Sequence, residues 1–385
     1  MDACDVLIVG GGPAGSSCAW GLRSSGLRVV VLDKARFPRN KVCGGWITPQ
    51  VLQALEIDPE DYARGRTCQP ITGFRISAMG RHEVQVSYGQ AVSYGIRRYE
   101  FDDYLLRRSG AEIRQGVSVH RIEPDSDGWT INGDIKARML VGAGGHFCPV
   151  ARRLGNGHSP SNSPSHSNVP EPVVAQELEF AMDAAQAKSC PIRPEIPELY
   201  FCSDLQGYGW CFRKDNFLNV GLGRLDQHAL PRHMSDFMRF LRTTGKLTCD
   251  SPEKPAGHAY FLIGRSGREI MADRVLFIGD SAGLAYIQSG EGIRPAVESG
   301  LFAANVIRGA NGCYTRARLE KYRELTDLWS QTFGHTTLAE RMPRNLRNKI
   351  GLLCLQTQWF CRHKVVEDWF LHRNTQQSAL SIQPA

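Results

Sequence analysis

Short runs of apolar residues mark the buried strands that this chain is predicted to form. DVLIVG (5–10) and RVVVLD (28–33) flank a helical pattern over roughly residues 13–25, and together they predict a strand, a helix and a second, parallel strand. Two later apolar runs, ARMLVGAGG (137–145) and DRVLFIGD (273–280), also lead into glycine-containing turns. We therefore expect them to be further strands of the same buried sheet.

A different pattern fills the middle and the end of the chain. Residues 173–265 alternate strand-like runs with turns, as in VVAQELEF, YGWCFRK and FLNVGLG, which is typical of an antiparallel sheet. From about residue 295 to the end the pattern is helical. Residues 155–172 are rich in Ser, Pro, Asn, His and Gly, and they predict an exposed loop in which His158 and His166 are solvated.

Charge adds information mainly about the C-terminal end. The formal net charge of the 385 residues is +7, and residues 311–385 hold 11 Lys and Arg against 6 Asp and Glu. The basic residues there alternate with apolar and aromatic ones, as in IGLLCLQTQWFCRHKVVEDWFL (350–371). Two interpretations stay open: a helical cap whose apolar stripe packs on the body, or a peripheral contact with anionic lipid. The basic residues form no dense run, so nucleic-acid binding is not expected.

Cysteine spacing and hydropathy argue against several other classes. The 12 cysteines include no CxxC pair and no zinc-finger spacing, so we expect no metal site. No apolar stretch reaches the roughly 18 residues that a membrane-spanning helix needs, and the N-terminus carries no signal-peptide pattern. We expect a cytoplasmic protein with free thiols, either in solution or held peripherally at the inner face of the membrane.

The turn after the first strand carries the first chemical motif. In GGGPAG (10–15), Gly10, Gly12 and Gly15 satisfy G-x-G-x-x-G between a predicted strand and a predicted helix. Gly10 allows the tight turn, Gly12 lets the backbone approach a pyrophosphate, and Gly15 permits close helix–strand packing. Asp33 ends the second strand, where a carboxylate can bind ribose hydroxyls. The segment predicts a dinucleotide site, and Asp33 favours an unphosphorylated ribose, as in FAD or NAD.

Later segments distinguish FAD from NAD. VLFIGDSAG (275–283) places Asp280 at the end of a hydrophobic strand. It resembles the second flavin motif of the p-hydroxybenzoate hydroxylase-like flavoproteins, which implies that Asp280 binds the ribityl chain of FAD. RRYEFDDYL (97–105) carries R-x-x-F-D, and the resemblance implies that Arg98, rather than Arg97, contacts the cofactor.

One segment departs from the pattern of those flavoproteins. LVGAGGHFCPVARRLG (140–155) has Gly144 where an aspartate is usual and Cys148 near the usual serine. The side-chain role of that aspartate is lost, so the resemblance implies no nicotinamide contact here. There is no second GxGxxG either, and we expect NAD(P)H, or another reductant, to bind only transiently.

Two further motifs resemble the geranylgeranyl reductase family. FPRNKVCGG (37–45) is similar to its P-x-x-K-x-C-G-G stretch, and GYGWCFRK (207–214) to its Y-x-W-x-F-P-K, with Arg213 in place of proline. Alternation along a strand puts Tyr208, Trp210 and Phe212 on one face, either as the wall of a substrate pocket or as a stripe of the core.

The resemblance implies that reduced FAD delivers hydride to a carbon–carbon double bond of an isoprenoid or other hydrophobic substrate. Cys43 is the first candidate for proton delivery and Tyr208 the second. We interpret Gly44 and Gly45 as positions where the lack of a side chain lets the flavin approach the backbone closely. A flavin-dependent monooxygenase acting through a C4a-hydroperoxide is the main alternative. A halogenase is disfavoured because CGG stands in place of its GES segment. The last alternative is a protein that binds FAD without a redox reaction.

These motifs define the predicted organisation. We expect an α/β protein with an FAD-binding Rossmann-type domain, an interleaved antiparallel-sheet substrate domain and a helical C-terminal segment. The predicted parts are residues 1–75, 95–155 and 266–310 for FAD, 76–94 and 173–265 for substrate, 156–172 as a loop, and 311–385 as a cap. The predicted cofactor-binding residues are Gly10, Gly12, Pro13, Ala14, Gly15, Asp33, Lys34, Cys43, Gly44, Arg98, Gly279, Asp280, Gly290, Gly292 and Ile293, with Glu291 a polar partner beside the ring. The expected partners are a hydrophobic small molecule, a redox partner and the peripheral membrane contact left open above.

Overall fold

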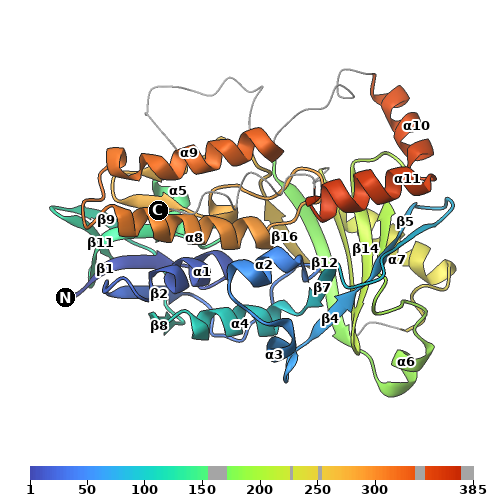
Figure 1. The fold of residues 1–385 in the computed structure, drawn as a ribbon, viewed down its shortest axis with the longest axis horizontal. Helices are drawn as coiled ribbons and strands as arrows, with labels where there is room; N and C mark the ends of the chain where they lie inside the picture. The colour runs from blue at the N-terminus through green and yellow to red at the C-terminus, as the bar shows by residue number, and fades with distance from the viewer. Residues whose placement is uncertain (155–170, 226–228, 250–253, 334–342, 374–385) are drawn as a thin grey trace.

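A computed structural model describes the chain except for residues 155–170, 226–228, 250–253, 334–342 and 374–385 (Figure 1). His158 and His166, with nearly all of the predicted loop, lie outside the described residues. The predicted α/β class is confirmed: a largely parallel sheet with helices occupies one half of the molecule, and a mostly antiparallel sheet occupies the other.

The first sheet has eight strands, and its centre is parallel. β1 pairs in parallel with β2 and β11, and β11 pairs in parallel with β18. The path runs β17 (Met271–Ala272), β18 (Val275–Phe277), β11 (Ile135–Gly142), β1 (Asp2–Val9), β2 (Val29–Asp33) and β8 (Glu112–Gln115), with β10 (Gly128–Ile131) and β9 (Ile122–Asp125) extending from β11. The predicted buried strands are present, and these apolar runs, far apart in sequence, are adjacent in the sheet. Their carboxyl ends meet at one edge, where ligands of such sheets bind.

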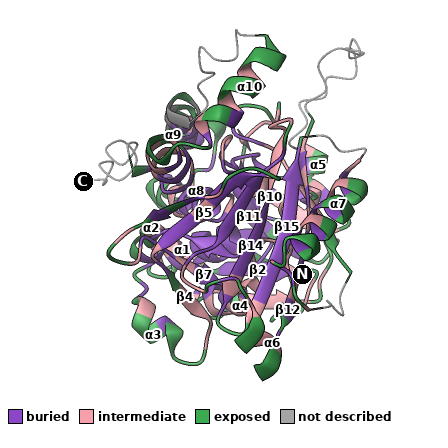
Figure 2. Cartoon of the chain, turned by 90° about the vertical axis from the view of Figure 1, so that its right-hand side faces the viewer, coloured by how far each residue is buried: buried purple, intermediate pink, exposed green. Residues whose placement is uncertain are grey.

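The second sheet has seven strands and is antiparallel except for one pair. Its order is β16 (Ala256–Tyr260), β12 (Val173–Ala181), β15 (Phe217–Arg224), β14 (Gly207–Lys214), β13 (Glu198–Phe201), β5 (Gly73–Ala78) and β6 (Val84–Ser87). β13 and β5 pair in parallel, which the sequence did not indicate. The buried strands of both sheets occupy the interior in Figure 2. The predicted domain boundaries stay predictions.

Helices cover both sheets. A three-stranded sheet of β3 (Trp46–Ile47), β7 (Ser93–Ile96) and β4 (Cys68–Ile71) lies beside them. The helices are α1 (Pro13–Leu22), α2 (Pro49–Ala54), α3 (Pro59–Ala63), α4 (Arg98–Arg108), α5 (Pro149–Leu154), α6 (Ala184–Ser189), α7 (Leu230–Thr243), α8 (Ile293–Gly309), α9 (Arg316–Phe333), α10 (Arg344–Cys354) and α11 (Gln358–Phe360). α11 continues into a π-helix, η3 (Cys361–Phe370).

The packing of α8 against α1 fixes the first half of the molecule. A Cβ at Gly300 would overlap the Ala14 carbonyl oxygen, and one at Gly21 would lie 2.7 Å from the Ala304 Cβ. Small residues therefore let the two helix backbones approach closely. Because α1 begins directly after β1, this contact also sets the position of the β1–α1 turn.

The C-terminal segment covers one face of the seven-stranded sheet. Leu352, Leu355, Val365 and Val366 are buried in one apolar cluster with sheet residues such as Trp210. The inward side of this segment therefore packs on the sheet, as the interpretation of a helical cap expects. Among the described residues, none of the helices is both long and apolar enough to cross a membrane.

A 3₁₀ turn and a loop follow β18. The turn is η1 (Gly279–Ser281), and α8 begins at Ile293, close to the predicted start of the helical pattern near residue 295. Gly283 and Gly290 both have positive φ, at +73° and +67°. These left-handed positions turn the chain within the loop, so no helix continues through them.

Candidate active site

A single cavity of about 660 Å³ collects most of the predicted site residues. It lies where the carboxyl ends of β1, β2 and β11 face the seven-stranded sheet. The predicted residues that line it are Gly10, Gly12, Pro13, Ala14, Asp33, Lys34, Cys43, Gly44, Arg98, Tyr208, Trp210, Phe212, Asp280, Gly290, Gly292 and Ile293. Gly15 and Gly279 are the two predicted residues that lie behind its wall.

The β1–α1 turn forms one end of the cavity. Gly10 has φ +117°, and a Cβ there would overlap the Ala143 carbonyl; a Cβ on Gly15 would overlap the Gly10 carbonyl. A Cβ on Gly12, in contrast, would meet nothing closer than Arg39 Nη2 at 3.5 Å. Gly10 and Gly15 thus shape the turn, while the space over Gly12 is open toward the cavity. This open space at the N-terminus of α1 fits a pyrophosphate.

Asp33 connects the end of β2 to this turn. Its Oδ2 accepts a hydrogen bond from the Gly11 N–H at 2.7 Å, and its Oδ1 accepts one from the Ala35 N–H at 2.8 Å. Each carboxylate oxygen can accept a second hydrogen bond. Asp33 therefore holds the turn and still presents acceptors to the cavity, which fits ribose hydroxyls.

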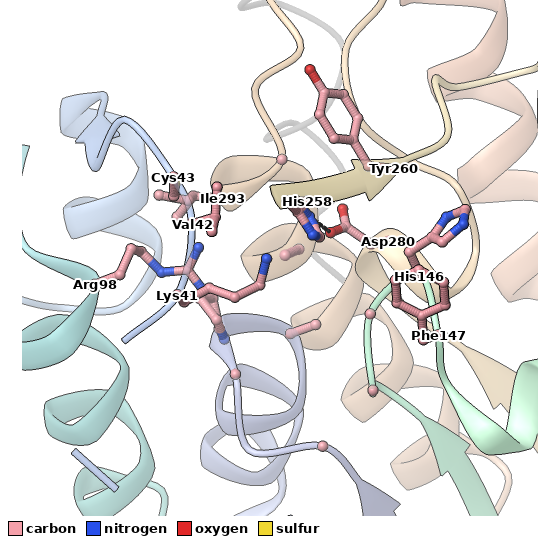
Figure 3. Close-up of a pocket in the computed structure, with 18 of the residues that line it drawn as sticks. Lys41, Val42, Cys43, Arg98, His146, Phe147, His258, Tyr260, Asp280 and Ile293 are labelled. Atoms are coloured by element: carbon pink, nitrogen blue, oxygen red, sulfur yellow. Dashed lines mark hydrogen bonds and ion pairs between the residues drawn. The ribbon is translucent and has the colours of Figure 1, made fainter. Parts of the chain in front are cut away.

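Asp280 faces the cavity from η1, opposite a histidine that the sequence analysis missed. His258 Nε2, on β16, lies 3.4 Å from Asp280 Oδ2 (Figure 3). Burial acts to raise the pKa of Asp280, but the bond with His258 and the charges of Lys41 and Arg98 outweigh it, so its pKa is lowered. Burial lowers the pKa of His258. An ionised Asp280 beside a neutral His258 can accept hydrogen bonds from a polyol such as a ribityl chain.

Gly279 supports Asp280 from behind the wall. It has φ +59°, and a Cβ there would lie 3.0 Å from the Ala14 Cβ. The glycine therefore lets the 3₁₀ turn approach the start of α1. It holds the two cofactor motifs together without reaching the cavity.

Arg98, and not Arg97, lines the cavity. Its guanidinium donates two hydrogen bonds to the carboxylate of Asp102, at 2.6 and 2.8 Å, and Arg39 Nη2 lies 3.1 Å from the same carboxylate. The R-x-x-F-D motif is thus an ion pair within α4. Arg97 pairs instead with Glu100 and Glu179.

The KVCGG segment (41–45) is clamped between two sheets. Asn219 Nδ2, on β15, donates to the Cys43 carbonyl at 3.3 Å, and the Ile96 N–H, on β7, donates to the Gly45 carbonyl at 2.7 Å. Gly45 has φ +63°, and a Cβ there would overlap the Ile96 carbonyl. A Cβ on Gly44 would lie 3.4 Å from ring atoms of Trp210 and Phe212. Packing within the protein therefore accounts for Gly45. A Cβ on Gly44 would make only ordinary contacts, and the role of Gly44 in close approach to the flavin stays a prediction.

Cys43 itself is half-buried and lines the cavity. Its Sγ accepts a hydrogen bond from the Gly45 N–H at 3.4 Å. Its catalytic role stays a prediction.

Three ionisable side chains line the cavity around this segment: Glu177 and Glu291 are buried, and Lys41 is half-buried. Burial, followed by the charge of Arg98, lowers the pKa of Lys41 to about 8. Burial raises the pKa of Glu177, on β12, to about 7, against the opposing effect of Lys214. Burial raises the pKa of Glu291 to about 8. Glu177 Oε2 and both oxygens of Glu291 have no hydrogen-bond partner among the described residues.

Sequence reasoning missed Glu177, although a signal was available. β12 reads VVAQELEFA, and alternation places Ala175, Glu177 and Glu179 on one face. Glu179 pairs with Lys214 Nζ at 2.6 Å, whereas Glu177, only 7% exposed, faces the cavity beside the Cys43 N–H. A glutamate in the buried stripe of an interior strand was therefore the indication.

Aromatic side chains form the other end of the cavity. Tyr208, Trp210 and Phe212 line it from β14, together with Phe370 at the end of η3. Trp210 and Phe212 also belong to the apolar cluster under the C-terminal segment, so this stripe is both core and cavity wall. The Tyr208 hydroxyl donates to the Ser289 carbonyl, and burial raises the pKa of Tyr208 well above its usual value.

The segment that departs from the flavoprotein pattern is also at the cavity. Gly144 lines it, while Cys148 is buried behind it. A Cβ on Gly144 would lie 3.1 Å from the Cys148 Cα, so little room exists for a larger side chain here.

The fold and this cavity define an FAD-dependent oxidoreductase. Residues 5–97 match the family described as FAD dependent oxidoreductase. The residues present also fit FAD, because the open space over Gly12, the acceptors of Asp33 and the Asp280 carboxylate face one cavity.

The sequence is similar to those of several reductases. The chain is 27% identical over 342 residues to menaquinone reductase of Mycobacterium tuberculosis, covering 80% of this chain and 77% of that one. It is 25% identical over 346 residues to digeranylgeranylglycerophospholipid reductase 2 of Methanosphaera stadtmanae, covering 85% and 84%.

Solved structures share the fold. A geranylgeranyl bacteriochlorophyll reductase-like protein of Thermoplasma acidophilum superposes with a TM-score of 0.73 at 20% identity, covering 93% of this chain and 92% of that one. A flavin-dependent brominase superposes with a TM-score of 0.68 at 16% identity, covering 96% and 92%. The predicted resemblance is confirmed: the chain is similar to FAD-dependent oxidoreductases of the geranylgeranyl reductase kind.

Proposed function

We propose that the protein reduces a carbon–carbon double bond of an isoprenoid or other hydrophobic substrate. The observation that carries the proposal is the carboxyl group of Glu177, buried in the wall of a cavity that joins the nucleotide-binding turn to an aromatic sheet face. Reduction of an alkene requires a proton donor in an apolar site, whereas oxygen insertion has no such requirement.

The cofactor end of the cavity supports binding and orientation. When bound, reduced FAD supplies the hydride of the reaction. The N-terminus of α1 would hold the pyrophosphate, Asp33 the ribose and Asp280 the ribityl chain. The clamp on KVCGG would fix the backbone next to the ring, because Asn219 and Ile96 hold it from both sides.

Glu177 would provide the proton to the second alkene carbon from its carboxyl oxygen. A carboxyl group whose pKa is near 7 is partly protonated at neutral pH, which suits a general acid. Cys43 remains the other predicted donor. Tyr208 is the weaker of the two earlier candidates, because its hydroxyl already donates to the Ser289 carbonyl.

The aromatic end suggests the class of substrate. Tyr208, Trp210, Phe212 and Phe370 present an apolar wall that would bind a hydrocarbon chain and exclude water. The names of the two relatives, a quinone reductase and a reductase of a geranylgeranylated lipid, point to isoprenoid substrates as well.

A monooxygenase acting on an aromatic or alkene substrate is the second candidate. It is favoured by the shared fold with a brominase and by the same cofactor site. For either reaction we propose a transiently bound nicotinamide or a redox partner as reductant.

The test is to reduce the FAD-loaded protein anaerobically and to follow its reoxidation by isoprenoid alkenes, monitored by flavin absorbance and product mass. We expect alkene-dependent reoxidation with a product that gains two hydrogens. Oxygen consumption triggered by the ligand, with an oxygenated product, would overturn the reductase and support the monooxygenase.

A further inference from the structure

We propose that the outward side of α10 is a docking surface for a lipid bilayer that contains anionic lipid. Leu346, Ile350 and Leu353 are 49%, 41% and 63% exposed, although all three are large and apolar. A helix turns about 100° per residue, so these positions share one side, which we call the α10 face. Trp359, 62% exposed, lies one turn beyond the end of the helix.

The opposite side of α10 already holds the helix on the body. Leu352 and Leu355 are buried in the apolar cluster of the seven-stranded sheet, and Asn348 Nδ2 donates to the Asp204 carbonyl at 3.0 Å. The helix is therefore attached without the α10 face. Figures 1 and 2 show α10 at the edge of the molecule, with much of its surface exposed.

The positive charge around the α10 face favours an anionic membrane as the partner. α10 carries Arg344, Arg347 and Lys349 and has no acidic residue. None of the three cations pairs with a carboxylate among the residues that the structure describes. Arg347 and Lys349 flank the apolar stripe on its two sides, by the same helical geometry. An apolar stripe between cations matches the interface of an anionic membrane, and the exposed Trp359 follows it in the sequence.

α10 packs close to the apolar end of the cavity: Leu352 and Leu355 share one apolar cluster with the cavity-lining Phe370. The chain runs from α10 through α11 to η3, and Phe370 at the end of η3 lines the cavity. Docking would therefore bring the aromatic end of the cavity near the bilayer. The inference that this bilayer supplies the substrate, an isoprenoid lipid, rests on the proposed function; the docking surface does not.

The experiment is flotation of the FAD-loaded full chain with vesicles of phosphatidylcholine, alone or mixed with phosphatidylserine. We expect binding to the mixed vesicles that weakens as salt is added. L346S/I350S/L353S should abolish most of it. R347Q/K349Q should weaken it about fivefold for each charge removed.

The matched control is R64Q/R107Q, which removes the same charge directly after α3 and on α4. These helices are at the lower edge of Figure 1, while α10 is at the upper edge. This control should bind vesicles like the parent protein. Flavin content and the unfolding temperature establish that each variant is folded. Amide hydrogen exchange of the parent protein is a second measurement that needs no variant, and residues 344–360 should exchange more slowly with mixed vesicles.

Several outcomes would overturn the docking surface. They are no binding to mixed vesicles, equal binding to both vesicle types, unchanged binding of the variants, or a concentration-dependent dimer that only L346S/I350S/L353S dissociates. The last would make the α10 face an interface between two copies. Reduction of a short water-soluble alkene without vesicles should be the same in all variants, so loss of docking is distinguishable from failure of the proposed reaction.

Discussion

Asn219 joins the seven-stranded sheet to the cavity-lining segment, because its Nδ2 donates to the Cys43 carbonyl at 3.3 Å. Its Oδ1 accepts a hydrogen bond from Trp210 Nε1 at 2.7 Å, and its Nδ2 lies 3.1 Å from Glu179 Oε2. The side chain is fully buried, so its loss leaves buried polar partners unsatisfied. We expect Asn219→Ala to lower the free energy of unfolding by about 1–3 kcal/mol and to lower turnover, measured by denaturant unfolding and steady-state kinetics.

Asn348→Ala is the control for Asn219→Ala, since it removes one hydrogen bond far from the KVCGG segment. It should leave turnover unchanged on a water-soluble alkene. If Asn219→Ala unfolds at the same denaturant concentration as the parent protein, the clamp has no energetic importance.

Cys43 tests whether the thiol at the cavity takes part in the reaction. We expect Cys43→Ser to keep FAD bound but to lower turnover or change the product, because Cys43 lines the cavity. Product analysis and flavin absorbance measure the two effects. Cys68→Ser is the control, since Cys68 is also half-buried and packs against the same apolar cluster as Cys43, but does not line the cavity. Kinetics and product equal to those of the parent would make Cys43 a packing residue.

Much of the architecture could be predicted because it follows from local patterns. Apolar runs ending in glycine identified β1, β11 and β18, and alternation identified the face of β14. The parallel pairing of β13 with β5 could not be predicted from the sequence, since it depends on contacts between residues more than a hundred positions apart. The start of α8 at Ile293 lies close to the predicted start near residue 295, because the helical pattern there is local.

The candidate site divides in the same way. Residues in motifs, such as Gly12 and Asp280, were found and line the cavity. Glu177 and His258 were missed. Each lies on a strand of the second sheet, and its place in the site depends on contact with a residue of another segment, Cys43 for Glu177 and Asp280 for His258. The interpretation of Gly45 was incomplete for the same reason: the carbonyl that excludes a side chain there belongs to Ile96.

The open space over Gly12 leads to a prediction that separates binding from folding. Gly12 has φ −73°, which any residue can adopt, and only the end of Arg39 lies near a Cβ. We expect Gly12→Val to fold but to exclude FAD, because the new side chain occupies the pyrophosphate position. Gly15→Ala should instead destabilise the fold, since its Cβ overlaps the Gly10 carbonyl. Thermal unfolding of the flavin-free protein and titration with FAD measure the difference, and tight FAD binding by Gly12→Val would contradict it.

Glu177 should make stability depend on pH. Its pKa is about 7 in the folded protein and about 4.3 when unfolded, so the folded state binds more protons between these values. The stabilisation is complete below about pH 4 and is lost as pH rises through about 7, amounting to about 4 kcal/mol. Glu177→Gln should remove this loss. The difference in unfolding free energy between parent and variant, measured from pH 5 to about pH 8, gives the effect.

The same variant tests the proton donor. In the parent protein, alkene reduction should fall as pH rises above about 7, because the carboxyl group of Glu177 loses its proton. Glu177→Gln should lower turnover by about 100-fold or more and remove this pH dependence, while FAD stays bound. Glu298→Gln is the matched control: Glu298 is buried, its pKa is raised by burial, and it pairs with Arg294 at 2.8 Å away from the cavity. It should alter stability against pH without altering the pH profile of turnover. An unchanged profile in Glu177→Gln would return the donor role to Cys43.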